Sequence, residues 1–231
     1  VDKNEEEAVR WYRKAAEQGY AQAQCTLGDC CLKGKGVEKD EKKAAEWYRK
    51  AAEQNDEEAQ YKLGQCYDDA VGVDWDTEKA AEWYKKSAEN GNRNAQYQLG
   101  RCYYFGNGVN EKKTEAVKWY QKAAEQNYAE AQYTLGECYY WGNGVLENRG
   151  EAVKWYEKAA ENYNADAQYS LGFCYERGIG VTQDFAKAAE WYREAAEQGD
   201  MTSQCNLGYL YESGRGVEKD LAKAAEWWSE R

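Results

Sequence analysis

The chain has 231 residues, of which 42% are hydrophobic and 15% aromatic, and its formal net charge at pH 7 is −11. It contains neither proline nor histidine, so the commonest helix breaker and the commonest general base and metal ligand are both missing. An acidic chain repels phosphate, which argues against nucleic acid as a partner, and no apolar run approaches the ~20 residues that a membrane-spanning helix needs.

The chain opens inside a repeating pattern. Tryptophan recurs every 36 residues, at Trp11, Trp47, Trp83, Trp119, Trp155, Trp191 and Trp227. A Leu-Gly pair recurs with the same step, and its glycines are Gly28, Gly64, Gly100, Gly136, Gly172 and Gly208. A fixed period of this size is typical of a solenoid, in which each unit buries its apolar face on the next.

Each period predicts two helices, as residues 129–162 illustrate. The first helix places small or apolar residues on one face, at Ala131, Leu135, Cys138 and Tyr139. A Gly-x-Gly-Val turn at 142–145 ends it, because glycine readily reaches positive φ. The second helix runs from about 149 to 162 and contains the tryptophan.

The pattern therefore predicts a single array over residues 1–231. An outer half-repeat at 1–20 is followed by repeats at about 21–56, 57–92, 93–128, 129–164, 165–200 and 201–231. Each repeat begins with an inner helix, and the outer helices contain the tryptophans. In the second repeat Ala70-Val71-Gly72 replaces Gly-x-Gly, so we expect a distorted turn there.

Both ends of the chain lie inside the pattern. The chain starts at Val1 within a repeat and closes on an outer helix with Trp227 and Trp228, which lack a following repeat to cover them. We therefore expect a piece of a longer protein, with weak self-association through the terminal helices. The regularity suits either a natural or a designed array, and the cysteines and irregular loops favour a natural source.

The repeated string A-x-AQY-x-LG-x-CY-x-x-G-x-GV-x-x-x-x-x-KAAEWY-x-KAAE resembles the Sel1-like repeat family, which is related to the tetratricopeptide repeat. In one repeat the matching residues are Ala131, Leu135, Gly136, Tyr139, Gly142, Gly144, Val145, Ala152, Tyr156, Ala159 and Ala160. The resemblance covers the whole chain. It implies an all-α fold, a right-handed α/α superhelical solenoid of 36-residue helix-turn-helix repeats with a concave groove, and a role as an adaptor or scaffold.

Eight cysteines invite a disulfide or metal interpretation. They are Cys25, Cys30, Cys31, Cys66, Cys102, Cys138, Cys174 and Cys205. Five share one repeat position, where the sixth repeat has Leu210, so the position is predicted to be a buried apolar slot. Equivalent positions in neighbouring repeats lie ~8–10 Å apart, beyond the ~7 Å reach of a disulfide.

Disulfides within a repeat and zinc sites are not predicted either. Some secreted relatives staple each repeat with two cysteines eight residues apart, but the corresponding positions here, such as Ala16 and Gln24, hold none. No C-x-x-C pair is present, so no zinc site is predicted. Reduced thiols favour a cytoplasmic setting; redox sensitivity of some thiols stays an alternative.

The expected partner-binding residues come from the family resemblance. In the tetratricopeptide repeat, inner-helix positions 2, 5, 9, 12 and 13 line the concave face, and here the middle of the array is aromatic at these positions while the flanks are charged. The predicted contact residues are Tyr97, Arg101, Tyr104, Phe105, Tyr133, Glu137, Tyr140, Trp141, Tyr169 and Phe173. Tyrosine, tryptophan and arginine dominate protein-binding hot spots. Alternatively, the position-5 tyrosines pack neighbouring inner helices, and the other aromatics pack on the turns or mediate self-association.

Nothing in the pattern predicts a catalytic residue, a cofactor or a metal. The Gly-x-Gly turns have no preceding strand and no following Lys-Ser/Thr, so they are interhelix turns rather than phosphate loops. The acidic segment at 68–76 lacks the ligand spacing of a calcium loop. The predicted function is a scaffold that binds a protein or peptide segment, basic rather than acidic, in the groove. A structural spacer in a longer chain is the alternative, and an enzyme is the least favoured.

Overall fold

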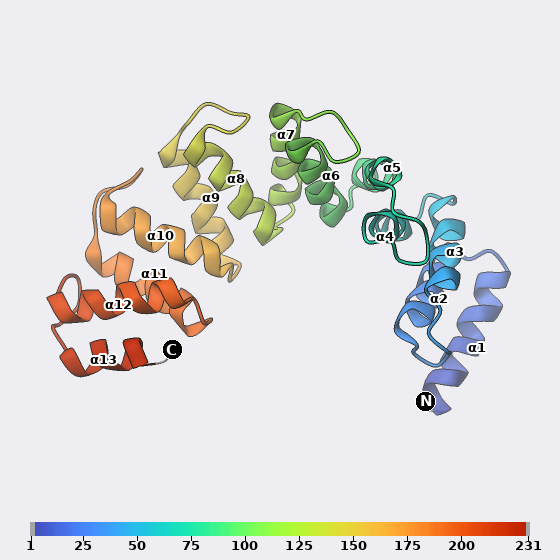
Figure 1. The fold of residues 1–231 in the computed structure, drawn as a ribbon, viewed down its shortest axis with the longest axis horizontal. Coiled ribbons are helices and arrows are strands. Elements are labelled where there is room, and N and C mark those ends of the chain that lie inside the picture. The colour runs from blue at the N-terminus through green and yellow to red at the C-terminus, as the bar shows by residue number, and fades with distance from the viewer. Residues whose placement is uncertain (1–2, 230–231) are drawn as a thin grey trace. The chain divides into compact units, whose positions relative to one another are not determined.

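The computed structural model describes residues 3–229, and these residues form thirteen α-helices and no strand. The outer helices are α1 (Lys3–Glu17), α3 (Glu41–Ala52), α5 (Thr77–Glu89), α7 (Lys113–Glu125), α9 (Arg149–Glu161), α11 (Phe185–Glu197) and α13 (Leu221–Ser229). The inner helices are α2 (Ala21–Lys33), α4 (Glu57–Asp68), α6 (Arg93–Phe105), α8 (Ala129–Trp141), α10 (Ala165–Arg177) and α12 (Met201–Ser213). The inner helices begin at the residues that the 36-residue period predicts (Figure 1).

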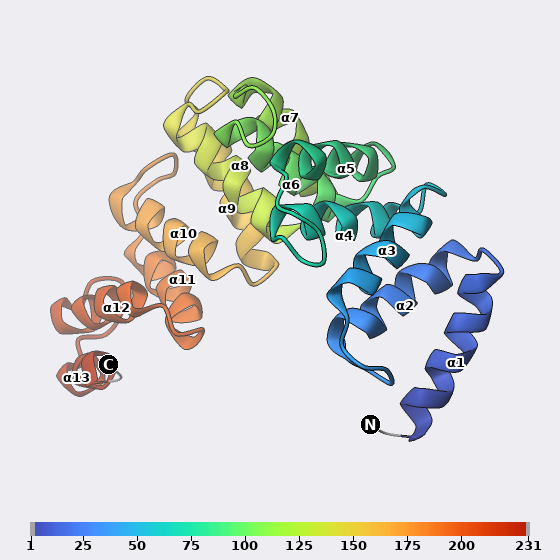
Figure 2. The same cartoon turned by 45° about the vertical axis from the view of Figure 1, so that its right-hand side comes forward.

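The helices stack in pairs, as an all-α solenoid does. Within each unit, inner helices pack against the outer helix that follows, as α2 does on α3 and α8 on α9 (Figures 1 and 2). The chain divides into two compact units between Trp119 and Tyr120, inside α7. Each unit is therefore described by itself below. None of the helices within residues 3–229 is long and apolar enough to cross a membrane.

Local sequence signals explain where the helices begin and end. Outer helices start after a side chain that accepts a hydrogen bond from the third helical residue, as Asp40 does from the amide of Lys43 and Asn148 from that of Glu151. Several inner helices end at a glycine in the left-handed conformation, for example Gly142 with φ 70°.

The turn at Ala70-Val71-Gly72 corrects the expectation of a distorted loop. Ala70 adopts φ 57° and Gly72 φ 69°, close to the 68° and 70° of Gly34 and Gly36. The amide of Val71 donates to the carbonyl of Cys66 at 2.9 Å, as the corresponding amide does in the other turns. A Cβ at Gly72 would collide with the backbone of Glu41 at the start of the preceding outer helix, so tertiary packing fixes this turn whatever residue precedes Val71.

A row of buried glutamines joins the repeats. Gln24 donates from Nε2 to the carbonyl of Ala16 at 3.0 Å, and its Oε1 accepts from Gln54 at 2.7 Å. Gln132 does the same with Ala124 at 3.1 Å and Asn162 at 2.9 Å. Each buried amide thus adds a second hydrogen bond to a carbonyl near the end of one outer helix and links the end of the next outer helix to it.

The cysteine slot is buried, as expected from its exchange with leucine. Cys30, Cys66, Cys102, Cys138 and Cys174 are all buried, and Leu210 occupies the same slot at 4% exposure. Burial raises the pKa of the Cys66 thiol to about 11 and that of Cys174 to about 12. These thiols are therefore held in their neutral, unreactive form.

The last outer helix corrects the expectation that Trp228 is uncovered. Its indole lies against Gly208 of α12, in the place that tyrosine takes in the other repeats, and forms an edge-on contact with Tyr209 at 5.5 Å between ring centroids. Its Nε1 donates to the carbonyl of Cys205 at 3.4 Å. Trp228 is half-buried and packs α13 against α12, while self-association through the terminal helices stays a prediction.

Candidate binding surface

The end of α6 presents an exposed aromatic pair in the first unit. The rings of Tyr104 and Phe105 meet edge to face, with centroids 4.9 Å apart, and Phe105 is 60% exposed. The ammonium of Lys113, at the start of α7, lies 5.2 Å from the centroid of the Tyr104 ring. Cation and aromatic edge together make a compact apolar surface with a positive group beside it.

The end of α8 repeats this arrangement in the second unit. Tyr140 and Trp141 meet edge to face at 4.8 Å, and Trp141 is 62% exposed. The guanidinium of Arg149, at the start of α9, lies 5.2 Å from the centroid of the Tyr140 ring. The sequence interpretation missed both cations. In the sequence, both could have been found as a basic residue nine positions after the tyrosine of these two repeats.

Glu137 holds this second surface in place. Its Oε2 accepts from the indole Nε1 of Trp141 at 3.0 Å, and its Oε1 accepts from the hydroxyl of Tyr156 on α9. The carboxylate and desolvation raise the pKa of Tyr156, with burial as the larger cause. Trp141 is thus exposed to solvent, yet it is oriented by the Glu137 carboxylate, which Tyr156 of the neighbouring helix also holds by a hydrogen bond.

The position-5 tyrosines are half-buried, and their main partner differs from the expected one. Tyr133 packs against Tyr156 of the following outer helix, with ring centroids 5.8 Å apart, and Tyr169 packs in the same way on Tyr192 at 6.1 Å. The next inner helix contributes a hydrogen bond from Ser170 to Tyr133. Burial, followed by the charge of Glu137, raises the pKa of Tyr133 to about 12. This row packs the helix pairs and exposes only part of each ring.

The remaining predicted residues differ in how far they are exposed. Tyr97 is half-buried, and Arg101 is exposed and donates to Gln98 at 3.3 Å. Phe173 is half-buried beneath the guanidinium of Arg177, which lies 5.9 Å from its ring centroid. Tyr97, Arg101, Tyr104 and Phe105 belong to the first unit, and the other six predicted residues belong to the second. A continuous strip across both units stays a prediction.

The acidic segment after α4 has structural partners. Asp68 accepts from the hydroxyl of Tyr84 at 3.2 Å, and Asp76 caps α5 by accepting from the amide of Lys79 at 2.9 Å. Hydrogen bonds from Lys79 lower the pKa of Asp76. Across residues 3–229, no cluster of three or more cysteine or carboxylate side chains could hold a metal ion.

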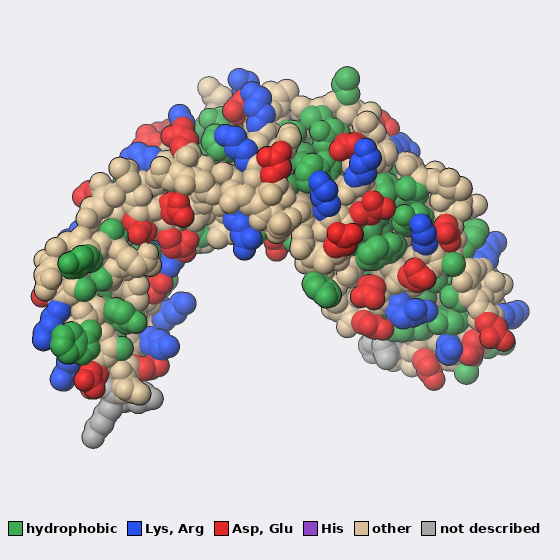
Figure 3. Space-filling model, turned by 180° about the vertical axis from the view of Figure 1, so that it is seen from behind, with side chains coloured by type: hydrophobic (Ala, Val, Ile, Leu, Met, Phe, Trp, Pro, Cys, Tyr) green, Lys and Arg blue, Asp and Glu red, His purple; other side chains and the backbone are tan. Residues whose placement is uncertain are grey.

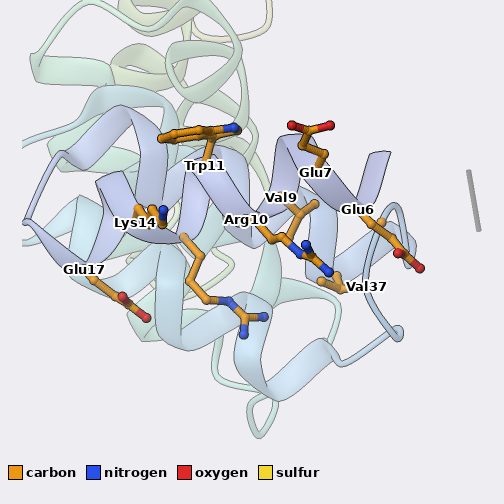
Figure 4. Close-up of a pocket in the computed structure, with 10 residues that line it drawn as sticks. Glu6, Glu7, Val9, Arg10, Trp11, Lys14, Glu17 and Val37 are labelled. Carbon is orange, nitrogen blue, oxygen red and sulfur yellow. The ribbon is translucent and has the colours of Figure 1, made fainter. Parts of the chain in front are cut away.

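Charges of both signs are interspersed on the face of the molecule shown in Figure 3. Local groups, rather than one broad field, therefore decide which ligands this surface attracts. A hollow of about 860 Å³ along α1 is lined by Val9, Trp11 and Val37 among charged side chains (Figure 4). Lys14 covers part of it, with its ammonium 4.6 Å from the Trp11 ring centroid.

Comparison with known proteins gives a consistent family. The Sel1 repeat model matches residues 1–20, 21–56, 57–92, 93–128, 129–164, 165–200 and 202–230. No curated protein matches the chain.

Solved structures of Sel1-type proteins are also similar. A protective antigen of uropathogenic Escherichia coli that displays an SLR fold is 40% identical, with a TM-score of 0.94 over 96% of this chain and 48% of its own. A Sel1 repeat protein from Oxalobacter formigenes is 34% identical, with a TM-score of 0.85 over 98% of this chain and 90% of its own. The chain thus spans about half the length of the E. coli structure. An immunity protein from Pseudomonas aeruginosa, 22% identical with a TM-score of 0.53 over 90% of this chain and 80% of its own, shares the fold alone.

Proposed function

Because this chain belongs to the Sel1 repeat family, whose repeats are generally protein–protein interaction modules and typically non-enzymatic, we propose that it is a scaffold that binds a segment of a partner protein. The proposed contact surface is the aromatic pair at the end of α8, and the similar pair at the end of α6 is a separate contact surface in the other unit. The observation that carries the proposal is Trp141, which is 62% exposed and yet held by a hydrogen bond to Glu137.

An exposed tryptophan that is already oriented loses little conformational freedom when a partner covers it. Ordering a free side chain at an interface costs about 0.5–1.5 kcal/mol, and pre-organisation avoids much of that cost. Trp141 offers a large apolar area, Tyr140 buttresses it edge-on, and the guanidinium of Arg149 borders it. Tryptophan, tyrosine and arginine are the residue types enriched in binding hot spots.

The partner in this proposal is a protein or peptide segment with apolar side chains for the aromatic pairs and basic neighbours for the acidic positions at the flanks. The full contact set is the one expected from the sequence, and the buried position-5 tyrosines contribute only their exposed edges. The burial of seven of the eight cysteines as thiols supports a reducing compartment such as the cytoplasm as the place where it acts.

A structural spacer is the competing function, favoured by the E. coli protein whose length is about twice that of the matched region. A spacer needs stacked helix pairs but no oriented, exposed tryptophan. Peptide binding that depends on Trp141 therefore separates the two functions.

The test is a selection of random 12-residue peptides displayed on phage against the whole chain, followed by calorimetry with the selected peptide. We expect Tyr140→Ala with Trp141→Ala to weaken binding about 30-fold, which corresponds to the loss of about 2 kcal/mol typical of a hot spot. Trp75→Ala, which removes another exposed tryptophan outside the inner helices, is the matched control and should leave the affinity unchanged.

Circular dichroism first establishes that each variant is folded. If the folded double variant binds as tightly as the unchanged chain, the aromatic pair at the end of α8 is not the binding surface. If no peptide is selected at all, the spacer function is favoured.

A further inference from the structure

In four outer helices a lysine side chain of the same helix lies over the tryptophan ring. The lysine three residues after the tryptophan places its ammonium over the indole ring in α1, α3, α5 and α9. The ammonium-to-centroid distances are 4.6 Å for Lys14 on Trp11, 4.1 Å for Lys50 on Trp47, 3.9 Å for Lys86 on Trp83 and 3.9 Å for Lys158 on Trp155. The chain itself therefore shows which group this ring face takes: a lysine ammonium.

Helix α11 departs from this pattern. Glu194 stands three residues after Trp191, where those four helices have lysine, and the last turn of α11 contains no basic residue. Within residues 3–229, no cation of the chain lies over the Trp191 ring, which is half-buried. An indole face that holds an ammonium elsewhere in the chain is here left without one.

A second change from a basic to an acidic residue lies near the Trp191 ring. In α3 and α11, Arg49 and Arg193 donate to a tyrosine hydroxyl, that of Tyr67 and Tyr211 respectively, at 3.0 Å. In α9 the corresponding residue is Glu157, which instead accepts from the hydroxyl of Tyr175 at 3.2 Å. Near the Trp191 ring, acidic residues thus stand at two positions that are basic in other repeats. One is Glu157 on α9, and the other is Glu194, three residues after Trp191.

These changes line one cavity of about 410 Å³ between α9 and α11. Trp191 and Tyr175 form its aromatic walls, and four carboxylates surround it, those of Glu157, Glu161, Glu190 and Glu194. The single basic side chain in its lining, Lys187, is directed to the other wall, with its ammonium 5.1 Å from the Tyr175 ring centroid. An aromatic face ringed by four carboxylates against one ammonium attracts a further cation.

We propose that this Trp191 pocket binds the ammonium group of a lysine side chain on a partner protein. The indole face takes the position against the cation that it has in the other repeats, and Glu194 and Glu190 supply the negative charge. The pocket is built from α9, α11 and the end of α10, so it is separate from the Trp141 surface and does not depend on the function proposed for it.

The test uses the full chain labelled with 5-fluorotryptophan and observed by ¹⁹F NMR, with the Trp191 signal assigned from Trp191→Phe. The probe is a capped pentalysine peptide, and the same peptide with every lysine side chain acetylated is its control. We expect a saturable shift of the Trp191 signal with pentalysine and none with the acetylated peptide. Glu194→Lys, which restores the residue found in the other repeats and so preserves the fold, should weaken binding by about tenfold or more.

Glu218→Lys is the matched control, because it changes the net charge by the same amount at an exposed loop position of the same unit. It should leave the affinity within about twofold. The proposal is overturned if the Trp191 signal does not respond to pentalysine, or if Glu218→Lys and Glu194→Lys weaken binding equally. Pentalysine binding should survive Tyr140→Ala with Trp141→Ala, so a failure of the Trp141 surface leaves this result standing.

Discussion

At the residue scale, the glycine of each Leu-Gly pair is fixed by a tyrosine ring. Tyr48, Tyr84, Tyr156 and Tyr192 are fully buried, and each lies directly on the glycine of the preceding inner helix. A Cβ added to Gly136 would lie 2.6 Å from the Tyr156 ring and 3.3 Å from the carbonyl oxygen of Ala152. Glycine therefore recurs every 36 residues because the helices of each pair approach closely there, not because the chain must be flexible.

Gly136→Ala should destabilise the protein. Helix propensity alone favours alanine over a mid-helix glycine by about 1 kcal/mol. Overpacking a filled core costs about 1–3 kcal/mol, and neither the fully buried ring nor the helix backbone has room to move. We expect a net loss of about 1–2 kcal/mol in the free energy of unfolding, measured by urea denaturation.

Gly150→Ala is the matched control for that substitution. Gly150 lies in helix α9, and an added Cβ would meet its nearest neighbours at 3.6 and 3.7 Å, which is ordinary contact. Propensity should dominate there and stabilise the protein by up to about 1 kcal/mol. If both alanine variants were stabilised alike, the tyrosine contact would not be what requires glycine at position 136.

Ala70→Gly should stabilise the protein, because Ala70 is held at φ 57° in a turn where other repeats use glycine. An L-residue in this conformation costs roughly 1–2 kcal/mol, and the extra freedom of glycine in the unfolded chain offsets about 0.4–1 kcal/mol of that. The expected gain is about 0.5–1 kcal/mol in urea denaturation. Gly106→Ala is the reverse test, because Gly106 has φ 75° and an added Cβ would meet no neighbour closer than 3.5 Å. It should destabilise the protein through the backbone strain alone. A loss of stability in Ala70→Gly would refute the strain.

At the scale of the helix pair, buried glutamines join successive outer helices. Gln132 is 1% exposed and links the end of α7 to the end of α9 through Ala124 and Asn162. Gln132→Leu keeps the volume but removes the hydrogen bonds that Gln132 forms with the Ala124 carbonyl and with Asn162, while the Ala124 carbonyl still accepts from the amide of Asn127. A hydrogen bond contributes about 0.5–1.5 kcal/mol, so we expect the loss of two to lower the free energy of unfolding by about 1–3 kcal/mol in urea denaturation.

Gln121→Leu controls for the loss of a glutamine, because Gln121 is exposed and bonds only to Glu125 on its own helix. Its effect should stay within about 0.5 kcal/mol. Equal effects of the two leucine variants would mean that the buried amide adds nothing to the joining of the helix pairs.

The elements could be predicted from the sequence because their causes are periodic. The spacing of apolar residues and glycines locates the inner-helix starts and the buried cysteine slot. The hold of Glu137 on Trp141 could not be predicted, because it depends on where two side chains of one helix and Tyr156 of the next converge. The conformation of Ala70 was also missed, since the backbone of Glu41 pressing on Gly72 sets that turn rather than the local sequence.

At the scale of the whole molecule, the repeated packing fades toward the first helix. Tyr12 and Trp11 of α1 are 39% and 63% exposed, whereas the equivalent Tyr156 and Trp155 of α9 are 1% and 8% exposed. Equivalent positions of the repeat are therefore buried to different degrees in different helices, although the sequence repeats.

The effect of burial can be measured at the cysteines, because the buried cysteine slot recurs through both units. Burial raises the pKa of Cys25, Cys102 and Cys174 to about 12, so the thiolate fraction at pH 8 falls by about three orders of magnitude relative to an ordinary thiol. Alkylation of these thiols by iodoacetamide must then wait for local opening. Cys205 is half-exposed and should react at least about tenfold faster than Cys174 in native buffer, as followed by peptide mass spectrometry. In 6 M guanidinium the difference should vanish, and equal rates already in native buffer would show that the slot does not shield its thiols.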